Sequence, residues 1–442
     1  MKKKIANWGN YPVMESDERQ IRFEDEIGRL VTENPSLLAR GNGRCYGDAA
    51  LAAKTINTVR FDKVLGFDIN TGIFDCQAGI TLDQILEIIV PKGWFLPVTP
   101  GTKFVTIGGA LASDVHGKNH HLEGSISNHV LDFDLILADG EPLKVTREDY
   151  PLLFEATAGG MGLTGVISRV RFQLKPIKTS YIRQKQIKAA NLTEILSLFE
   201  QYHEYTYSVA WIDCLSTGKS FGRSILMLGE HAEEHEVKNA GSKLKAGKKP
   251  MFTLPFYFPS FALNKLTIKA FNWLYYNKNL KKVQDSVTHY EPFFYPLDAL
   301  NEWNKMYGKK GFVQYQFVLP YSGKQGLIDI LTRISKKGLG SFLAVLKVFG
   351  KQESMISFPF EGYTLALDFP VSDALFPFLD ELDVIVEEYG GRVYMSKDAR
   401  MDAGFFARTY PRLNEFRAVL DQYNPQQKFS SEQAHRLHIF SN

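Results

Sequence analysis

The stretch that decides the fold is Arg40-Gly41-Asn42-Gly43-Arg44-Cys45-Tyr46-Gly47-Asp48, which places three glycines within seven residues. Glycine adopts positive φ angles and allows a ligand to approach the main-chain N–H groups closely. Successive exposed N–H groups form a nest that suits a pyrophosphate, although an ordinary glycine-rich turn has the same composition. The GxGxxG and GxxxxGK[ST] spacings are absent from this stretch, so a Rossmann fold or a P-loop is not expected.

Three more glycine-rich stretches follow in the N-terminal part of the chain. They span residues 99–110, 113–121 and 158–167. Four glycine-rich stretches in one part of the chain are more than ordinary turns would require. A long, flat, polyanionic ligand that is gripped at several places explains them better, and a dinucleotide has this shape and charge.

Short apolar runs alternate with turn residues around these stretches. Strands are predicted at residues 58–62, 72–78, 131–138 and 165–174. Residues 82–90 place apolar side chains at helical spacing and predict a helix. Pro176 ends the last of these strands and a different pattern begins after it, so a domain boundary is expected near residue 176.

The C-terminal part continues with helical and strand-like segments. Helices are predicted at residues 192–202 and 376–389, and strands at 208–215, 311–320 and 342–349. Residues 238–249 are basic and predict a flexible loop. Residues 250–277 are dense in phenylalanine and tyrosine, and they form either buried core or an exposed surface that meets lipid. The core interpretation is favoured because large apolar residues are usually buried.

The composition is that of an ordinary globular protein. The chain has 442 residues, 44% hydrophobic residues and a formal net charge of +3, which argues against disorder and against a nucleic-acid partner. Three widely spaced cysteines provide no CxxC pair. The lysines at the start are not followed by an apolar segment, so neither a signal peptide nor a membrane span is expected. A cytoplasmic location is the default, and association with a membrane face stays open.

Single polar residues in apolar surroundings mark further candidates. His116 and Lys118 alternate on an extended segment, and Gln314 and Gln316 alternate on a predicted strand, so each pair shares a face. Lys347 is the one charge in an apolar run, and a buried lysine needs an anionic partner, which a phosphate, a flavin or an internal carboxylate would supply. His116, His120 and His121 lack a suitably paired carboxylate or cysteine, so no metal site is predicted.

Several of these motifs together resemble the vanillyl-alcohol oxidase superfamily of FAD enzymes. Within it, the chain is similar to the flavin subunits of decaprenylphosphoryl-β-D-ribose 2′-epimerases. The similarity rests on residues 43–48, 114–121, 311–317, 341–347 and 393–400, and it extends over nearly the whole chain. It implies a two-domain α+β fold: an FAD-binding domain at 1–176, an antiparallel-sheet substrate domain at 177–390, and a segment at 391–442 that returns to the flavin.

The resemblance implies an FAD-dependent oxidoreductase that acts on CH–OH donors. Such an enzyme oxidises the 2′-hydroxyl of a polyprenylphosphoryl ribose to a ketone. A separate NADH-dependent short-chain reductase then gives the arabinose epimer for cell-wall biogenesis. The FAD is expected to be non-covalent, because the loop at 40–48 contains Arg44 and no histidine.

The resemblance also assigns roles to residues. The residues expected to bind FAD are Ala39, Arg40, Gly41, Asn42, Gly43, Arg44, Cys45, Tyr46, Gly47, Asp48, Ala49, Gly101, Thr106, Ile107, Gly108, Gly109, Ser113, Asp114, Val115, His116, Ile167 and Tyr394. The residues expected to bind substrate are Lys118, Trp211, Gln314, Gln316, Lys347, Thr364 and Lys397. The catalytic candidates are Lys397, His116 and Tyr394. Lys397 would stabilise negative charge on the flavin. Tyr394 lies three residues earlier, so both face the flavin only if the strand bends between them.

The sequence differs from the family pattern at two positions, and two other functions are considered. Family members carry a cysteine where Ala366 stands here, and an asparagine where Thr364 stands, so the lipid or the sugar can differ. An aldonolactone or alditol oxidase would act on a small soluble sugar, and residues 250–277 would then be core. A non-catalytic flavoprotein would bind FAD that no alcohol reduces.

Overall fold

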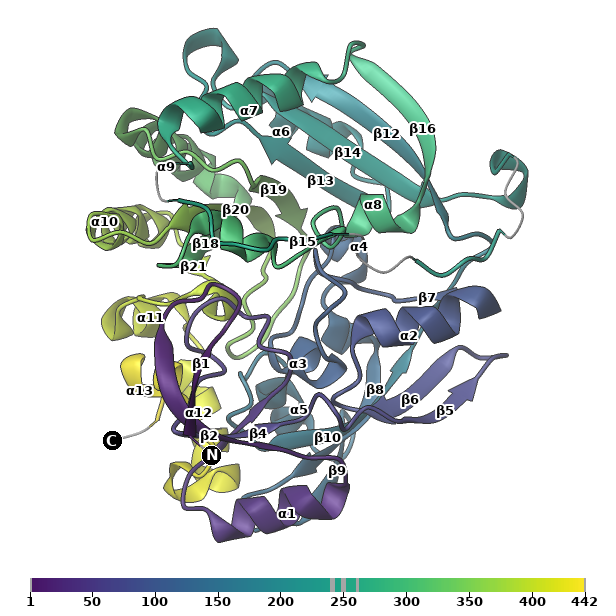
Figure 1. Cartoon of the computed structure of the whole chain (residues 1–442), viewed down its shortest axis with the longest axis vertical. Coiled ribbons are helices and arrows are strands. Elements are labelled where there is room, and N and C mark those ends of the chain that lie inside the picture. Colours follow the sequence, from purple (N-terminus) through teal and green to yellow (C-terminus); the bar gives the residue numbers. More distant parts are fainter. Residues whose placement is uncertain (1, 239–242, 248–251, 260–261, 441–442) are drawn as a thin grey trace.

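The computed structural model describes residues 2–238, 243–247, 252–259 and 262–440. The chain forms two halves that are stacked along its long axis (Figure 1). The lower half combines the N-terminal part of the chain with the C-terminal segment, and the upper half is built from the residues between them.

Two sheets form the lower half. A four-stranded sheet has the order β1-β2-β4-β3 and contains β1 (Lys2–Ala6), β2 (Val13–Gln20), β3 (Leu38–Arg40) and β4 (Lys54–Asn57). A five-stranded antiparallel sheet has the order β5-β6-β10-β8-β9 and contains β5 (Val64–Asp68), β6 (Ile73–Gln77), β8 (Val130–Ile136), β9 (Pro142–Thr146) and β10 (Val166–Gln173). Short strands β7 (Trp94–Phe95) and β11 (Lys175–Pro176) pair beside them.

Helices cover these sheets and carry the apolar side chains that form the core. They are α1 (Glu24–Glu33), α2 (Leu82–Ile89), α3 (Ile107–Ala112) and α5 (Pro151–Thr157), whereas the short helix α4 (His120–Glu123) contacts the upper half of the molecule. Helix α2 buries Leu82, Ile85, Leu86 and Ile89, and the Thr81 hydroxyl caps it by accepting from the Gln84 N–H. The apolar spacing and the cap together explain why this segment is helical, as predicted.

The upper half is built on one eight-stranded antiparallel sheet with the order β16-β12-β14-β13-β19-β20-β18-β21. Its strands are β12 (Tyr181–Ala189), β13 (Tyr207–Ile212), β14 (Ser224–His231), β16 (Val283–His289), β18 (Phe312–Leu319), β19 (Ala344–Phe349), β20 (Gly362–Pro370) and β21 (Arg392–Val393). The short strands β15 (Phe252–Thr253) and β17 (Leu300–Asn301) pair outside it.

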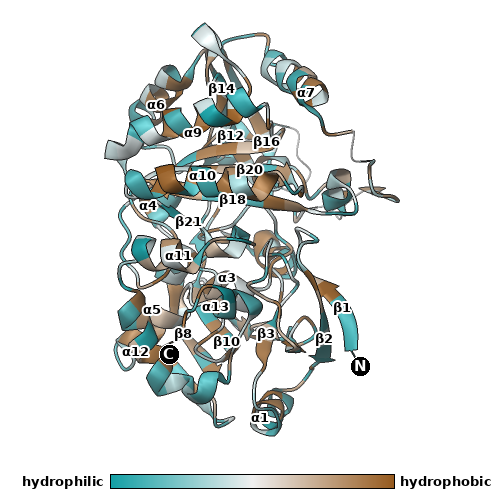
Figure 2. Cartoon of the chain, turned by 90° about the vertical axis from the view of Figure 1, so that its left-hand side faces the viewer, coloured by the Kyte–Doolittle hydropathy of each residue, from teal (hydrophilic) through white to brown (hydrophobic). Residues whose placement is uncertain are grey.

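Two layers of helices flank this sheet. Helices α6 (Leu192–Gln201), α9 (Lys324–Lys337) and α10 (Leu375–Glu388) pack on one face, and α7 (Lys265–Asn277) lies on the other side (Figures 1 and 2). Helix α8 (Tyr290–Phe294) follows β16. The chain then returns to the lower half through α11 (Ala403–Thr409), α12 (Leu413–Tyr423) and α13 (Glu432–Arg436). None of the helices in the described residues is long and apolar enough to cross a membrane.

Most predicted elements are confirmed, and two predictions are wrong. Residues 58–62 form a turn, in which the Phe61 N–H donates to the Thr58 carbonyl at 2.8 Å and Phe61 enters the core; the strand precedes it, at β4. Within 250–277, the described residues are largely exposed rather than core, including Phe252 at 68% and Leu266 at 78%. Residues 239–242, 248–251 and 260–261, parts of two predicted segments, lie outside the described residues. The domain boundaries at 176 and 390 stay predictions, and β21 lies just past the second.

Candidate active site

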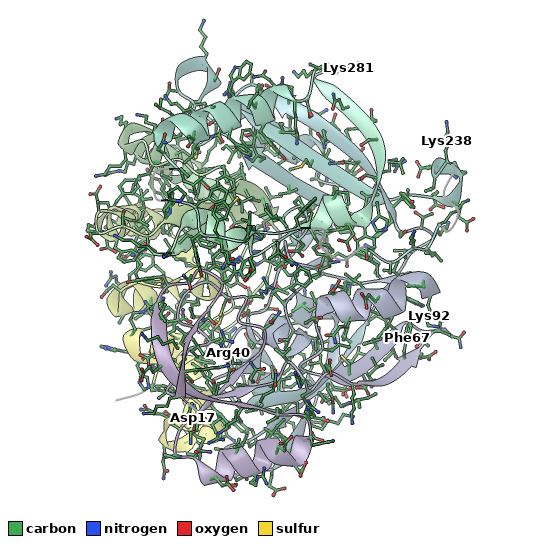
Figure 3. All side chains as sticks on the ribbon, viewed as in Figure 1. Asp17, Arg40, Phe67, Lys92, Lys238 and Lys281 are labelled. Atoms are coloured by element: carbon green, nitrogen blue, oxygen red, sulfur yellow. The ribbon has the colours of Figure 1, made fainter. Side chains whose placement is uncertain are left out.

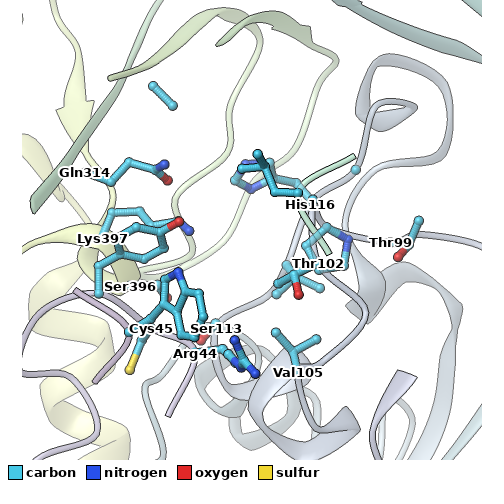
Figure 4. Close-up of a pocket in the computed structure, with 18 of the residues that line it drawn as sticks. Arg44, Cys45, Thr99, Thr102, Val105, Ser113, His116, Gln314, Ser396 and Lys397 are labelled. Carbon is cyan, nitrogen blue, oxygen red and sulfur yellow. The ribbon is translucent and has the colours of Figure 1, made fainter. Parts of the chain in front are cut away.

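A cavity of about 660 Å³ lies between the two halves of the molecule. The glycine-rich stretches of the lower half form one wall, and the eight-stranded sheet forms the other. Figure 4 shows Gln314 and Lys397 on one side of the cavity, His116 across from them, and Arg44 and Cys45 below. Residues far apart in the sequence therefore meet around a single ligand-sized space.

The loop at 40–48 has the properties of an anion nest. Within the described residues, the main-chain N–H groups of Asn42, Gly43 and Arg44 donate to no other residue. Gly43 has a φ of +59°, which a side chain rarely tolerates. A Cβ at Gly101 would meet nothing within 4 Å, so this cavity-lining glycine leaves open space for a ligand. Free N–H groups beside open space are what a bound pyrophosphate requires.

Both ends of this loop are tied to other segments. The Arg40 guanidinium donates to the Ala6 carbonyl at 2.7 Å and does not line the cavity. Asp48 accepts two hydrogen bonds of 2.8 Å from Arg436 on α13, and Arg436 also donates to Asp398 at 2.7 Å. A Cβ at Gly47 would lie 1.7 Å from the Asp398 carbonyl oxygen, so only glycine fits there. These contacts hold the loop against the segment that carries Lys397.

Three lysines give the cavity a positive charge. Burial lowers the pKa of Lys118 to about 7, and burial together with the charges of Lys118 and Lys397 lowers that of Lys347 to about 7. Burial also lowers the pKa of Lys397 to about 8. Lys118 donates to the Phe293 and Phe294 carbonyls at 2.8 and 3.2 Å, whereas Lys347 and Lys397 form no ion pair among the described residues. A cavity with such cations is suited to an anionic ligand.

The backbone bends between Tyr394 and Lys397. Strand β21 ends at Val393 and residues Met395–Lys397 form a 3₁₀ turn, so both side chains line the cavity. The Tyr394 hydroxyl donates to the Ser113 carbonyl at 2.8 Å, and its ring stacks on Phe358 at 4.5 Å. The Lys397 ammonium lies 3.9 Å from the centre of the Tyr46 ring, an attractive contact that holds the charge in place.

Hydrogen bonds fix the orientation of His116. The Thr364 hydroxyl donates to the Phe317 carbonyl at 2.8 Å, so it accepts from the Gln316 amide at 3.3 Å. This turns the Gln316 NH₂ group toward His116 Nε2, 3.1 Å away, and makes that nitrogen the acceptor. Burial keeps the pKa of His116 well below its usual value, so the imidazole is neutral. The site thus contains an uncharged base with a defined tautomer.

One face of the upper sheet forms the outer part of the cavity. Gln316, Ala366, Val345 and Trp211 lie in register across β18, β20, β19 and β13, and all four line the cavity. Gln314 belongs to the same face and donates to the buried Asp368 at 2.6 Å. Burial raises the pKa of Asp368 to about 7. This wall changes from polar at β18 to apolar at β13.

The structure brings most of the predicted site residues together. Six of them do not line the cavity: Arg40, Gly47, Asp48, Ile107, Asp114 and Thr364. Asp114 is turned away, accepting from Gln352 at 2.8 Å and from Ser357 at 2.6 Å. Thr364 is fully buried on the neighbouring strand β20 and accepts a hydrogen bond from the Gln316 amide. These six residues support the cavity wall instead of forming it.

Several cavity residues were missed by the sequence analysis. They include Trp8, Gln184, Gln186, Met227, Tyr275, Lys278, Asp298 and Trp303. Trp8 stacks under the Arg44 guanidinium at 4.1 Å. The alternation of Gln184 and Gln186 could have predicted a shared polar face, as the alternation of Gln314 and Gln316 did. For Trp8 no local signal exists, because its role depends on contact with a loop distant in sequence.

The free N–H groups, the open space at Gly101 and the lysines fit a flavin dinucleotide. The residues that would hold it are those of the loop at 41–46, Gly101, Gly108, Gly109 and Tyr394. Fold and site together define the class: the protein is an FAD-dependent oxidoreductase with a two-domain α+β fold of the vanillyl-alcohol oxidase type.

Comparison with known proteins narrows this class. A family described as FAD binding domain matches residues 25–146. The decaprenylphosphoryl-beta-D-ribose oxidase of Mycolicibacterium smegmatis is 35% identical over 99% of this chain and 98% of its own length. The chain therefore belongs to the decaprenylphosphoryl-β-D-ribose oxidase family. An uncharacterized protein in the mprA 5′ region of Streptomyces coelicolor is 31% identical over 81% of this chain and all of its own length. A mitochondrial D-2-hydroxyglutarate dehydrogenase of Bos taurus is 29% identical, but only over 33% of this chain and 27% of its own length.

Proposed function

We propose that this enzyme oxidises the 2′-hydroxyl of a polyprenylphosphoryl ribose, or of a similar lipid-linked sugar, to a ketone. The observation that carries the proposal is that three kinds of surface line one cavity. They are the glycine-rich loop, the three lysines, and an apolar part of the sheet that includes Trp211 and is joined by Tyr275. A flavin, a sugar phosphate and a prenyl chain need these three surfaces. The name of the relative from Mycolicibacterium smegmatis supports the same substrate.

FAD, when bound, would accept the hydride that leaves the alcohol carbon. His116 would take the hydroxyl proton at Nε2 once the substrate hydroxyl replaces the Gln316 amide, which donates to the single lone pair of that nitrogen in this structure. Lys397 would provide a fixed positive charge where negative charge develops. Tyr394 would hold its ring against the ligand, because its hydroxyl is fixed on Ser113. The loop at 40–48 has no histidine, which supports non-covalent binding of the cofactor.

Lys118 and Lys347 are the proposed phosphate ligands. Lys347 has no anionic partner among the described residues, so a phosphate would remove the cost of its burial. Gln314 and Gln316 would bind sugar hydroxyls from the same side of the sheet. Trp211 and the apolar residues beyond it would contact the start of the lipid. We also propose that a separate NADH-dependent reductase consumes the ketone, and that the enzyme takes its substrate at a membrane face.

Anaerobic titration of the FAD-loaded enzyme tests the function. A polyprenylphosphoryl ribose is expected to bleach the flavin absorption, whereas free ribose and alditols at the same concentration are not. Bleaching by the soluble polyols but not by the lipid-linked sugar would contradict the proposal and favour a small-sugar oxidase. A flavin that none of these compounds reduces would contradict it in favour of a non-catalytic flavoprotein.

The lysines predict a pH dependence of substrate binding. Lys118 and Lys347 have pKa values of about 7, so they lose their charge as the pH rises through that value. An anionic substrate binds the charged form, so its KM is expected to rise roughly tenfold between pH 6.5 and 8.5. The Lys347→Arg variant keeps its charge over this range and should show a flatter KM profile. A flat profile in the wild-type enzyme would contradict the assignment.

A further inference from the structure

Helix α7 exposes its apolar face to solvent. Leu266, Ala270, Trp273 and Leu274 follow one another at helical spacing and all are exposed, with Trp273 at 57% and Leu274 at 62%. The opposite face packs inward through Ile268 and through Asn272, whose amide donates to Asp213 at 2.8 Å. A surface helix normally turns its apolar stripe toward the core, so the stripe on α7 lacks a partner within the described chain. Figure 2 shows α7 at the outer edge of the upper half.

The region around this apolar stripe is strongly basic. Between Val237 and Gln284 the sequence contains ten lysines and neither aspartate nor glutamate, although the whole chain has a net charge of only +3. Five of these lysines lie on α7 or directly after it, at positions 265, 269, 278, 281 and 282. Lys281 projects from the top of the molecule, beyond the end of α7 (Figure 3). Exposed leucines and a tryptophan flanked by lysines are typical of a helix that lies in the headgroup region of an anionic bilayer.

The same helix reaches the active-site cavity. Tyr275 and Lys278 line the cavity, and the Tyr275 ring lies 4.7 Å from that of Trp211. Trp211 in turn belongs to the apolar part of the sheet wall. The exposed stripe and the apolar part of the cavity are therefore joined through less than three turns of one helix.

We propose that the exposed stripe of α7 docks onto an anionic phospholipid bilayer, and that the lipid-linked substrate passes from that bilayer into the cavity beside Tyr275. The docking surface consists of Leu266, Ala270, Trp273 and Leu274 with the lysines at 265, 269, 278 and 281. The passage of substrate rests on the proposed function, whereas the docking does not.

Vesicle flotation with the FAD-loaded full chain tests the docking. The wild-type enzyme is expected to float with vesicles that contain phosphatidylglycerol and to stay behind with pure phosphatidylcholine. The L266E/W273E variant should lose at least tenfold in vesicle affinity. It should keep its flavin spectrum and its turnover of a detergent-solubilised, short-chain substrate, because neither residue lines the cavity. Leu152→Glu is the matched control, since Leu152 is 58% exposed on α5 in the lower half.

Three outcomes would overturn the docking proposal. They are equal flotation of L266E/W273E and wild type, equal binding of the wild type to both kinds of vesicle, and a wild-type dimer in sedimentation that L266E/W273E dissociates. The last outcome would assign the stripe to a second copy of the chain. Specific vesicle binding by an enzyme whose flavin no lipid-linked sugar reduces would leave the docking intact and contradict the proposed function alone.

Discussion

Replacing Lys397 by methionine is expected to lower kcat by a factor of about 10²–10³, which corresponds to ~2.7–4 kcal/mol. Methionine keeps most of the volume and removes the charge. The Lys397 ammonium is held over Tyr46, 3.9 Å from the ring centre, and forms no ion pair among the described residues. The ammonium group is already in place when negative charge develops during hydride transfer, so no side chain has to move. It therefore stabilises the transition state more than the bound substrate, and its loss lowers kcat.

Stopped-flow measurement of flavin reduction under anaerobic conditions tests this prediction. The ratio of flavin to protein absorbance must be measured alongside, so that loss of cofactor is separated from loss of rate. Lys92→Met is the matched control, because Lys92 is an exposed lysine at the right-hand edge of the molecule (Figure 3) and does not line the cavity. A Lys397→Met enzyme with full flavin content and a rate of reduction within threefold of wild type would contradict the catalytic role.

Replacing Arg436 by methionine is expected to lower the free energy of unfolding by about 3–5 kcal/mol. Arg436 donates to Asp48 and Asp398, and both aspartates are buried, with 4% of each residue exposed. Its removal leaves two buried carboxylates without their shared cation. Because Asp48 ends the glycine-rich loop and Asp398 follows Lys397, FAD affinity should fall as well.

Urea unfolding of the cofactor-free protein measures this effect. Arg408→Met provides the comparison, because Arg408 pairs with Glu387 at the surface with its side chain 59% exposed. Exposed ion pairs contribute about 0–1 kcal/mol, so this control should change stability little. Equal effects of the two substitutions would show that Arg436 does not hold the loop and the Lys397 segment together.

Sequence patterns correctly predicted those elements whose structure is determined by residues close together in the sequence. The helix at 82–90 and the strand at 311–320 were predicted from apolar spacing, and the structure contains both. The bend between Tyr394 and Lys397 was required for both to face one ligand, and a 3₁₀ turn provides it. The glycine-rich loop was predicted to form an anion nest, and its free N–H groups are consistent with one.

Features that depend on distant contacts were predicted less well. Asp114 lies in a quoted motif, yet Gln352 and Ser357 hold it away from the cavity. Thr364 was predicted to bind substrate, but its hydroxyl instead orients the side chain of Gln316 on the adjacent strand β18. Residues 250–277 were interpreted as core because they are aromatic. Their burial depends on whether another surface covers them, and sequence spacing carries no information on that.

The contact between Arg436 and Asp48 has a consequence for protein synthesis. These residues are 388 positions apart, and Lys397, which completes the cavity, comes late in the chain. A ribosome releases the chain from its N-terminus, so the loop at 40–48 is made long before the residues that fix it in place. A nascent chain therefore cannot form the finished cofactor site. We expect full retention of FAD only after the last helix has left the ribosome.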